Sequence, residues 1–497
     1  MSSMKTNNRP YFIDKTEQRH TQGKLAIIDI GSSMVRLVIY DDITGYPHLI
    51  LNEKVWVALG EGKKDENFSL DQSKVQRTIS VLEWFVWICE KAGCENVLTV
   101  ATAAVRQAQN QDAFVKSVRK KTGLHIEVLS GESEARLAAA GAIVSIPDAH
   151  GLVVDLGGGS MELCETHGEK RIVSIPKGVL SLQAESDNNP LVAIDILKKE
   201  IEQHPWLQEE SHTSLVALGA GMRSIARLYM EEKNHPLKIL HDFRIERDDI
   251  IQFCRDLTNG KTSKRISGLT KEWKDVLPFR AATLCALMES TNLKNIRFAT
   301  FGIREGLLFT QSAQCSVCDD PFIAYTTDVA RRDGKGLGYA TALAEWTTPY
   351  IPSIEPRLLK AAACYCEIAW REQPLYRGKS IFEQALGGSY VGVGHKTRAR
   401  LALMSFFRHE DKLLKGMSEQ INGLVSPEQI HQAQIVGTLF RLAAMLDPGF
   451  KGLLSSFSLR YEEDGYILNA PKAFLKMESE AVNECLKKLN ILINKLN

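Results

Sequence analysis

Two short segments of the chain have the composition of phosphate-binding loops. Residues 29–33 read Asp-Ile-Gly-Ser-Ser, and residues 155–160 read Asp-Leu-Gly-Gly-Gly-Ser. Each segment follows an apolar run and precedes alternating apolar sequence, so a strand, a carboxylate, a glycine-rich turn and a second strand occur twice. Glycines leave backbone N–H groups free to approach an anion, and a hydroxyl adds another donor. The sequence therefore predicts two loops that hold a phosphate from both sides of a cleft.

The donors of these loops and the carboxylates beside them define two kinds of binding residue. A carboxylate next to a phosphate site indicates a metal ion between them, and Mg²⁺ takes one or two protein oxygens together with phosphate oxygens. Asp155 and Glu162 suit such a site, and Asp29 could share the metal; a solvent-facing strand position remains an alternative for Glu162. The predicted phosphate-binding residues are Gly31, Ser32, Ser33, Gly157, Gly158, Gly159 and Ser160.

Catalytic candidates lie between the two loops. Glu134 follows a short strand and a Ser-Gly pair, so it lies near a helix start, where a carboxylate could position an attacking water. The alternative is that Glu132 or Glu134 only stabilises the helix dipole. Arg106 sits at a strand end, where a guanidinium could bind phosphate oxygens in a bidentate manner; an ordinary ion pair is its alternative.

Two further arginines have the same two interpretations as Arg106. They are Arg36, in the strand after the first loop, and Arg304, in a late Phe-Gly-Ile-Arg-Glu-Gly segment. We expect Arg304 to connect the second half of the chain to the cleft through Glu305.

The elements that must position these residues alternate between strand and helix. In residues 24–146, strands are predicted around the first loop and at 97–101 and 126–129, with helices at 70–92, 113–122 and 133–142. The pattern repeats from residue 151, with helices at 191–202, 222–232, 248–257, 274–290 and 305–312 and strands at 170–175, 214–218 and 297–301. After about residue 313, helices are predicted at 338–346, 357–370, 397–407, 427–446 and 473–496, with a hairpin within 455–468. This alternation predicts α/β halves followed by a mainly helical domain.

Composition narrows the class of protein. The 497 residues carry a formal net charge of +1, which excludes a globally basic nucleic-acid binder, and we expect no nucleic-acid partner. The 10 cysteines are scattered, so a cytoplasmic protein with reduced thiols is expected; Cys315 and Cys318 form a lone CxxC pair. Residues 1–23 are predicted to be a flexible tail, and no apolar run is long enough to cross a membrane.

Five segments in order carry a resemblance to a known family. The two related halves resemble the sugar kinase, heat-shock protein and actin superfamily, and the segments narrow this to the exopolyphosphatase/guanosine-pentaphosphate phosphohydrolase (Ppx/GppA) family. The segments are residues 25–38, 101–110, 129–137, 154–163 and 301–306.

The resemblance implies a fold, a reaction and a set of roles. The fold would be two actin-like (ribonuclease H-like) ATPase-type domains, residues 24–147 and 148–313, flanking a cleft, with a helical domain at 314–497. Glu134 would be the carboxylate that activates water and Arg106 would stabilise the departing charge. The reaction would be Mg²⁺-dependent, processive hydrolysis of the terminal phosphate of inorganic polyphosphate.

The sequence departs from the family pattern at three turns. The first loop has Ser33 and Met34 where the family usually has Asn and then Ser or Thr, and Met161 replaces a usual Thr. The third turn reads Gly-Ala-Gly at 219–221 where Gly-Gly-Thr is usual. The carboxylates all remain, so we expect an active enzyme.

The helical region contains basic residues that suggest a polyanion path. A chain of phosphates crossing this surface would gain from each cation, although a solvated helix face explains them equally well. Helical tails of this type often pair, which suggests a homodimer. The predicted path residues are Arg377, Lys379, Lys396, Arg398 and Arg400.

Two other functions remain open at this point. Family members divide between polyphosphate and guanosine pentaphosphate as substrate, and the sequence does not choose between them. A phosphate or nucleotide sensor that uses the same cleft without turnover is the alternative from another class.

Overall fold

The computed structural model describes residues 23–41, 46–60, 68–261, 271–310, 319–449, 452–462, 465–477 and 479–495. The predicted tail, except for Gly23, and the Cys315/Cys318 pair lie outside these ranges. The chain divides into two compact units. The first contains Met1–His235 and Leu240–Asp319, and the second contains Pro236–Ile239 and Asp320–Asn497.

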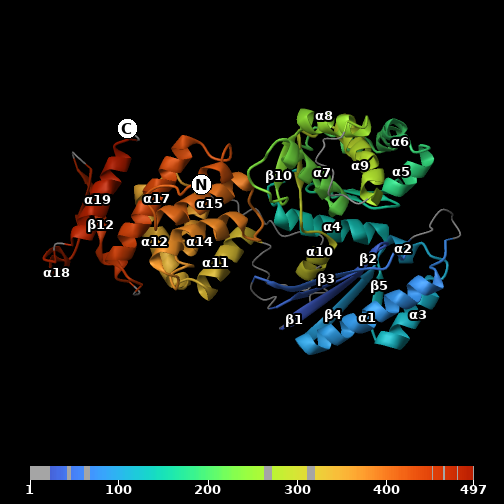
Figure 1. The fold of residues 1–497 in the computed structure, drawn as a ribbon, viewed down its shortest axis with the longest axis horizontal. Helices are drawn as coiled ribbons and strands as arrows, with labels where there is room; N and C mark the ends of the chain where they lie inside the picture. Colours follow the sequence, from blue (N-terminus) through green and yellow to red (C-terminus); the bar gives the residue numbers. More distant parts are fainter. Residues whose placement is uncertain are drawn as a thin grey trace. The chain divides into compact units, whose positions relative to one another are not determined.

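The first sheet is five-stranded with the order β3-β2-β1-β4-β5. Its strands are β1 (Lys24–Ile30), β2 (Met34–Tyr40), β3 (Leu49–Trp56), β4 (Cys94–Ala101) and β5 (Ile126–Val128). Strands β1, β4 and β5 are parallel, whereas β2 and β3 run antiparallel to their neighbours. Two long helices, α1 (Gln72–Ala92) and α3 (Gln111–Thr122), cover one face, and the short α2 (Ala103–Arg106) follows β4 (Figure 1).

The second sheet repeats this order and adds one strand. Its order is β10-β11-β9-β6-β7-β8, so β8-β7-β6-β9-β11 corresponds to β3-β2-β1-β4-β5. Its strands are β6 (Gly151–Leu156), β7 (Met161–Glu165), β8 (Ile172–Ile175), β9 (Ser214–Leu218), β10 (Phe243–Glu246) and β11 (Asn295–Phe298). The helices of this half are α5 (Val179–Glu185), α6 (Pro190–Glu202), η2 (Pro205–Gln208), α7 (Gly219–Glu232), α8 (Arg247–Thr258) and α9 (Lys271–Ser290).

Two helices form a layer between the sheets (Figure 1). Helix α4 (Gly131–Ser145) packs against β6, β7, β8 and β9 of the second sheet, although it follows β5 in sequence. Helix α10 (Ile303–Thr310) packs along α4 and also contacts β1. The two helices approach closely because Gly306 has no side chain: a Cβ atom there would lie 2.0 Å from the Leu137 carbonyl oxygen.

The second unit is mainly helical and has its own core. Its helices are α11 (Pro321–Arg332), α12 (Leu337–Thr347), η5 (Thr348–Tyr350), α13 (Pro356–Tyr365), α14 (Pro374–Gly387), α15 (His395–Phe407), α16 (Met417–Gln420), α17 (Pro427–Leu446), η6 (Leu454–Ser456), α18 (Lys472–Leu475) and α19 (Glu480–Ile493). A hairpin of β12 (Ser458–Glu462) and β13 (Gly465–Asn469) packs against α19.

These elements confirm the predicted fold class of two α/β halves and a helical region. The elements that were not predicted from sequence include β3, α5, α11 and α14. The single helix predicted over 473–496 is wrong, because α18 ends at Leu475 and α19 begins at Glu480. Among the described residues, the structure contains no helix with the length and apolar character needed to cross a bilayer.

Candidate active site

Two equivalent rows of polar residues cross the sheets at the same place. In the first sheet, Asp29 on β1 lies opposite Arg36 on β2, which lies opposite Lys54 on β3. Directly opposed residues point to the same face of a sheet. The row is therefore one aspartate followed by two cations.

The corresponding row of the second sheet has the opposite chemistry. Asp155 on β6 lies opposite Glu162 on β7, which lies opposite Ser174 on β8. In the second sheet, Val153 packs with α4 residues, and Asp155 points the same way because it lies two residues further along β6. In the first sheet, Asp29 contacts Arg304 on α10. Both rows therefore face the α4/α10 layer. One sheet thus presents mainly cations and the other mainly carboxylates.

The two glycine-rich turns have the same internal hydrogen bond. The Gly31 N–H donates to the Met34 carbonyl at 3.0 Å, and the Gly157 N–H donates to the Ser160 carbonyl at 2.9 Å. These two amides are used within their turns. Phosphate binding by Gly31 and Gly157 stays a prediction, and the later N–H groups of each turn are further candidate donors.

The second turn is braced so that later amides face away from α5. The Gly157 and Gly158 carbonyls accept from the N–H groups of Val179 and Leu180, at 3.1 and 2.8 Å, and the Gly159 carbonyl accepts from the Ser181 hydroxyl at 3.2 Å. In a trans peptide the next N–H points opposite to the carbonyl. The N–H groups of Gly158, Gly159 and Ser160 therefore point away from α5 as a set of three adjacent donors.

The first turn is braced in a similar way by the chain after β3. The Ser32 carbonyl accepts from the Gly60 N–H at 2.8 Å, and the Ser33 carbonyl accepts from Val57 and Ala58, both at 2.9 Å. By the same reasoning, the N–H groups of Ser33 and Met34 point away from that segment.

Arg106, the last residue of α2, contacts Glu134 in the first turn of α4. Ser130 caps this helix by accepting from the Ser133 N–H, which places Glu134 just inside the helix. Arg106 Nη1 lies 2.8 Å from Glu134 Oε2 and also donates to the Leu129 carbonyl at 2.8 Å. Burial raises the pKa of Glu134 to about 7, against the opposing effect of Arg106. Glu132, by contrast, is exposed and pairs with Arg136.

Asp155 and Glu162 form the acidic centre of the second row. Burial, followed by repulsion from Glu162, raises the pKa of Asp155 to about 6. Burial also raises the pKa of Glu162, although its Oε1 accepts hydrogen bonds from Ser160 at 2.7 Å and Ser174 at 3.1 Å. Two buried carboxylates that repel each other can supply the oxygen ligands of a divalent cation, whose charge would relieve the repulsion. The solvent-facing alternative for Glu162 is excluded by its 4% exposure.

Asp29 has a different neighbour from Asp155. Arg304 Nη1 lies 3.2 Å from Asp29 Oδ2 and connects α10 to the first row. Glu305 provides a second link from α10 to the first sheet, because it accepts from the Tyr40 hydroxyl of β2 at 3.1 Å; it also accepts from the Gly302 N–H at 2.8 Å. Asp29 is already paired with a cation, which favours Asp155 and Glu162 as metal ligands.

Sequence reasoning missed two cations near this site. Lys54 lies in β3, which was not predicted, because residues 49–56 read Leu-Ile-Leu-Asn-Glu-Lys-Val-Trp and lack the apolar–polar alternation of a half-buried strand. Arg223 follows the third glycine turn, and its charge acts on both Asp155 and Lys54.

The predicted polyanion path is partly corrected by burial. Arg398 is 1% exposed, donates to the carbonyls of Gly388 and Tyr390 and stacks on the Tyr390 ring. Arg400 is 8% exposed and pairs with Glu355 at 3.0 Å. Both arginines therefore stabilise the second unit from within.

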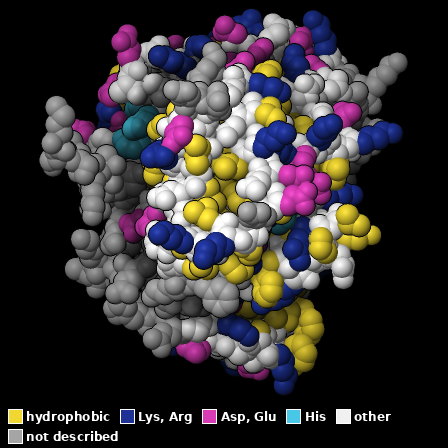
Figure 2. All heavy atoms as spheres, turned by 90° about the vertical axis from the view of Figure 1, so that its left-hand side faces the viewer, with side chains coloured by type: hydrophobic (Ala, Val, Ile, Leu, Met, Phe, Trp, Pro, Cys, Tyr) yellow, Lys and Arg dark blue, Asp and Glu magenta, His cyan; other side chains and the backbone are white. Residues whose placement is uncertain are grey.

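The other three path residues have more accessible positions. Lys379 and Lys396 are exposed, and Arg377 is half-buried. On the face drawn in Figure 2, basic side chains are separated by acidic and hydrophobic ones and form no continuous stripe.

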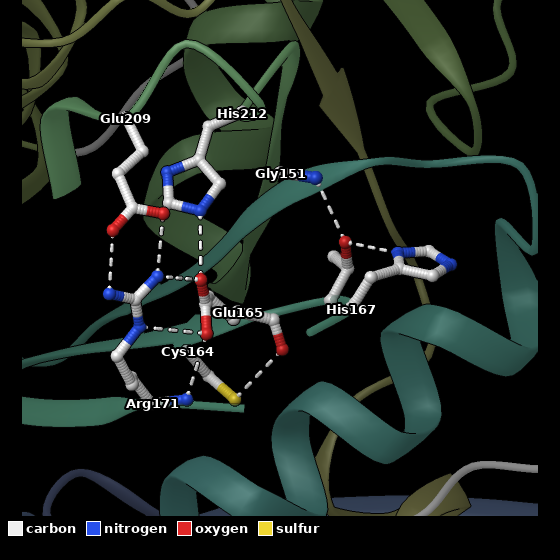
Figure 3. Close-up of polar contacts among 8 residues, drawn as sticks. Gly151, Cys164, Glu165, His167, Arg171, Glu209 and His212 are labelled. Atoms are coloured by element: carbon white, nitrogen blue, oxygen red, sulfur yellow. Dashed lines mark hydrogen bonds and ion pairs between the residues drawn. The ribbon is translucent and has the colours of Figure 1, made fainter. Parts of the chain in front are cut away.

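A second acidic group lies away from the rows. Ligand atoms of Glu165, Glu209 and His212 lie within 4.8 Å of one another. Arg171 already fills this group: it contacts Glu165 at 2.5 Å and Glu209 at 2.7 Å (Figure 3). Glu165 is paired with Leu152 at the opposite end of β6 from Asp155, and it points to the other face from Glu162. This group is an ion-pair network separate from the candidate active site.

Family models match most of the chain. The model of the Ppx/GppA phosphatase family matches residues 38–314, and the model described as exopolyphosphatase, C-terminal, matches residues 328–496.

Curated relatives include bacterial and yeast proteins. Two are named guanosine-5'-triphosphate,3'-diphosphate pyrophosphatase. That of Photobacterium profundum is 26% identical over 90% of this chain and 92% of its own length. That of Pseudoalteromonas atlantica is 27% identical over 59% of each chain. Retrograde regulation protein 2 of Saccharomyces cerevisiae is 24% identical over 76% of this chain and 71% of its own.

A solved structure supports the same assignment. The PPX-GPPA enzyme of Aquifex aeolicus is 26% identical, with a TM-score of 0.52 over 58% of this chain and 99% of that one. With the duplicated loops, the paired rows and the α4/α10 layer, these matches place the chain in the Ppx/GppA phosphatase family.

Proposed function

We propose that this protein is a phosphoanhydride hydrolase that releases the terminal phosphate of inorganic polyphosphate. One observation carries the proposal: Glu134 and Arg106 meet at 2.8 Å, and the charge of Glu162 acts on Glu134. A carboxylate with its pKa raised to about 7, beside a guanidinium and an acidic pair, is suited to orienting water for attack on phosphorus.

The chain's own residues have distinct roles in this mechanism. The adjacent N–H groups of Gly158, Gly159 and Ser160 would bind oxygens of the terminal phosphate. Glu134 would accept a hydrogen bond from the attacking water and take its proton as the new O–P bond forms. The bond from the same phosphorus to the bridging oxygen would break, and the shortened chain would leave as a phosphate anion. Arg106 would orient Glu134 and balance negative charge on the transferred group.

Asp155 and Glu162 would hold a divalent cation, with Mg²⁺ as the expected ion. The fit rests on two buried carboxylates that repel each other and on the two serines that orient Glu162. When bound, the cation would offset charge on the phosphate oxygens. The Arg304 contact leaves Asp29 as an orienting group for the first turn.

The test compares two glutamates on the same helix. Orthophosphate release from long-chain polyphosphate with Mg²⁺ is measured for the unmodified protein, Glu134→Gln and Glu132→Gln. We expect Glu134→Gln to lower kcat about a hundredfold or more, because a positioned base contributes about 10²–10⁴. Glu132→Gln should retain activity, because Glu132 is exposed and its ion pair is with Arg136 on the same helix. Equal rates for all three proteins would remove Glu134 from the mechanism.

Guanosine pentaphosphate is the second candidate substrate. The name of the Photobacterium relative, which covers 90% of this chain, favours guanosine pentaphosphate. The same assay with guanosine pentaphosphate distinguishes the two through the ratio of kcat/KM values. Release from neither substrate would favour a sensor that binds phosphate without turnover.

A further inference from the structure

Two serine hydroxyls hold the Glu162 carboxylate, and both donate to the same oxygen. Ser160 Oγ lies 2.7 Å from Glu162 Oε1, and Ser174 Oγ lies 3.1 Å from it. Within the described part of the chain, Glu162 Oε2 accepts no side-chain hydrogen bond. A carboxylate that is held through one oxygen keeps a fixed orientation and offers the other oxygen to a cation. The two serines therefore leave Oε2 as the oxygen that a divalent cation would contact.

The two serines reach Glu162 from different parts of the fold. Ser160 belongs to the second glycine-rich turn, lies two residues before Glu162 and is 8% exposed. Ser174 belongs to β8, the edge strand, and lies directly opposite Glu162, so its hydroxyl is on the same face of the sheet. The Ser174 side chain is exposed, although the residue that it binds is buried. Ser174 can therefore be replaced without removing a core contact.

Gly131 brings Ser174 against the start of α4. Gly131 is the first residue of that helix, which packs against β8. A Cβ atom at Gly131 would lie 3.3 Å from Ser174 Oγ and 4.0 Å from Arg106 Nη2. The glycine thus leaves room for the serine hydroxyl and for the guanidinium whose Nη1 donates to Glu134. The hydroxyl that holds Glu162 lies beside the helical turn that carries Glu134.

We propose that Ser174 is a positioning residue that connects the cation-binding carboxylate of Glu162 to the first turn of α4. Its hydroxyl would hold Glu162 in the orientation that a divalent cation requires, and its contact with Gly131 would keep that carboxylate in place relative to Glu134. This inference rests on the proposed function and adds to it a residue that touches neither the substrate nor the attacking water.

Mn²⁺ binding tests the role of Ser174 without turnover. Mn²⁺ prefers oxygen ligands, and the electron paramagnetic resonance signal of free Mn²⁺ measures its Kd for the full chain. Ser174→Ala should weaken Mn²⁺ binding about tenfold or more, because loss of a hydrogen bond to a metal ligand typically costs about 10–100-fold in affinity. Ser174→Thr keeps the hydroxyl and should retain most of the affinity. Ser80→Ala removes an exposed hydroxyl from α1 and should leave the Kd unchanged.

Gly131→Ala tests the contact between Ser174 and α4. The added methyl group would crowd Ser174 Oγ at 3.3 Å, so Mn²⁺ should bind more weakly. The Tm should not fall, because alanine is a better helix former than glycine. In the Ser174→Ala background, Gly131→Ala should have no further effect on the Kd, since the displaced hydroxyl is absent. Equal weakening in both backgrounds would show that Gly131 acts without Ser174 and would overturn the connection.

The outcomes separate this inference from the proposed function. An unchanged Mn²⁺ Kd in Ser174→Ala would overturn the positioning role, and so would a loss of affinity that appears only together with a lower Tm. Mn²⁺ binding that Asp155→Asn does not weaken would place the ion elsewhere and would also overturn it. If the unmodified protein releases no phosphate while Ser174→Ala still weakens Mn²⁺ binding, hydrolysis is rejected and the role of Ser174 stands.

Discussion

At the scale of residues, the candidate site is organised by strand register. Asp29 and Asp155 occupy equivalent positions in the two sheets. The residue directly across from Asp29 on the next strand is Arg36, whereas the residue directly across from Asp155 is Glu162. One duplicated framework therefore carries an anion-binding half and a cation-binding half. The glutamate on α4 lies with the acidic half, since the charges of Glu162 and Asp155 act on it.

The raised pKa of Glu134 predicts a pH dependence of activity. A base must be ionised, so kcat/KM should fall as pH drops through about 7 and Glu134 becomes protonated. The negative charges of Glu162 and Asp155 raise the pKa of Glu134, and a bound divalent cation would offset those charges. The acidic limb should therefore move to lower pH as Mg²⁺ increases, measured by initial rates from pH 5 to 9. An acidic limb that persists unchanged in Glu134→Gln would assign it to another group.

At the scale of elements, the α4/α10 layer brings the two rows together. Helix α4 supplies Glu134 and packs on the second sheet, while α10 supplies Arg304 and contacts β1. The close approach of these helices depends on small residues at their crossing. A Cβ at Gly141 would lie 2.3 Å from the Gly302 carbonyl oxygen.

Gly306→Ala tests this crossing. The added Cβ would meet the Leu137 backbone, which cannot move as a flexible side chain can, so we expect destabilisation of at least about 1–3 kcal/mol. Thermal unfolding of the purified protein measures the effect. Gly302→Ala is the matched control, because its Cβ would enter open space. A Tm for Gly306→Ala equal to that of the control would show that α4 and α10 can move apart without loss of stability.

At the scale of the whole molecule, buried carboxylates link stability to pH and to cations. The folded pKa values of Asp155 and Glu134, about 6 and about 7, exceed the ordinary values of 3.8 and 4.5. Their contribution to stability is complete below those ordinary values and is lost as pH rises through 6 and 7. Glu165 has the opposite sign: burial opposes ionisation, but Arg171 outweighs it and lowers its pKa to about 2. Its contribution is lost as pH falls from about 4.5 toward 2.

This linkage predicts how Mg²⁺ changes the Tm. The ion should raise the Tm more at pH 8, where Asp155 with its pKa of about 6 is ionised, than at pH 5, where a proton competes for Asp155. Asp155→Asn should abolish most of the Mg²⁺ effect and, without Mg²⁺ at pH 8, should raise the Tm by removing a buried charge. Differential scanning calorimetry at both pH values measures these shifts. The same Mg²⁺-induced rise in Asp155→Asn would place the ion elsewhere.

The sequence by itself determined the duplicated strand-turn-strand units, the two aspartates and the position of Glu134 near a helix start. These features are local, since they depend on apolar periodicity, glycine and capping residues within a few positions. Tertiary structure alone decided which residues face them. The pairing of β2 with β3 aligned Lys54 with Arg36, and the α4/α10 crossing directed Arg304 to Asp29. Packing of the second unit buried Arg398 and Arg400, which the sequence suggested as surface cations. Register and burial depend on contacts between distant segments, which spacing along the chain does not encode.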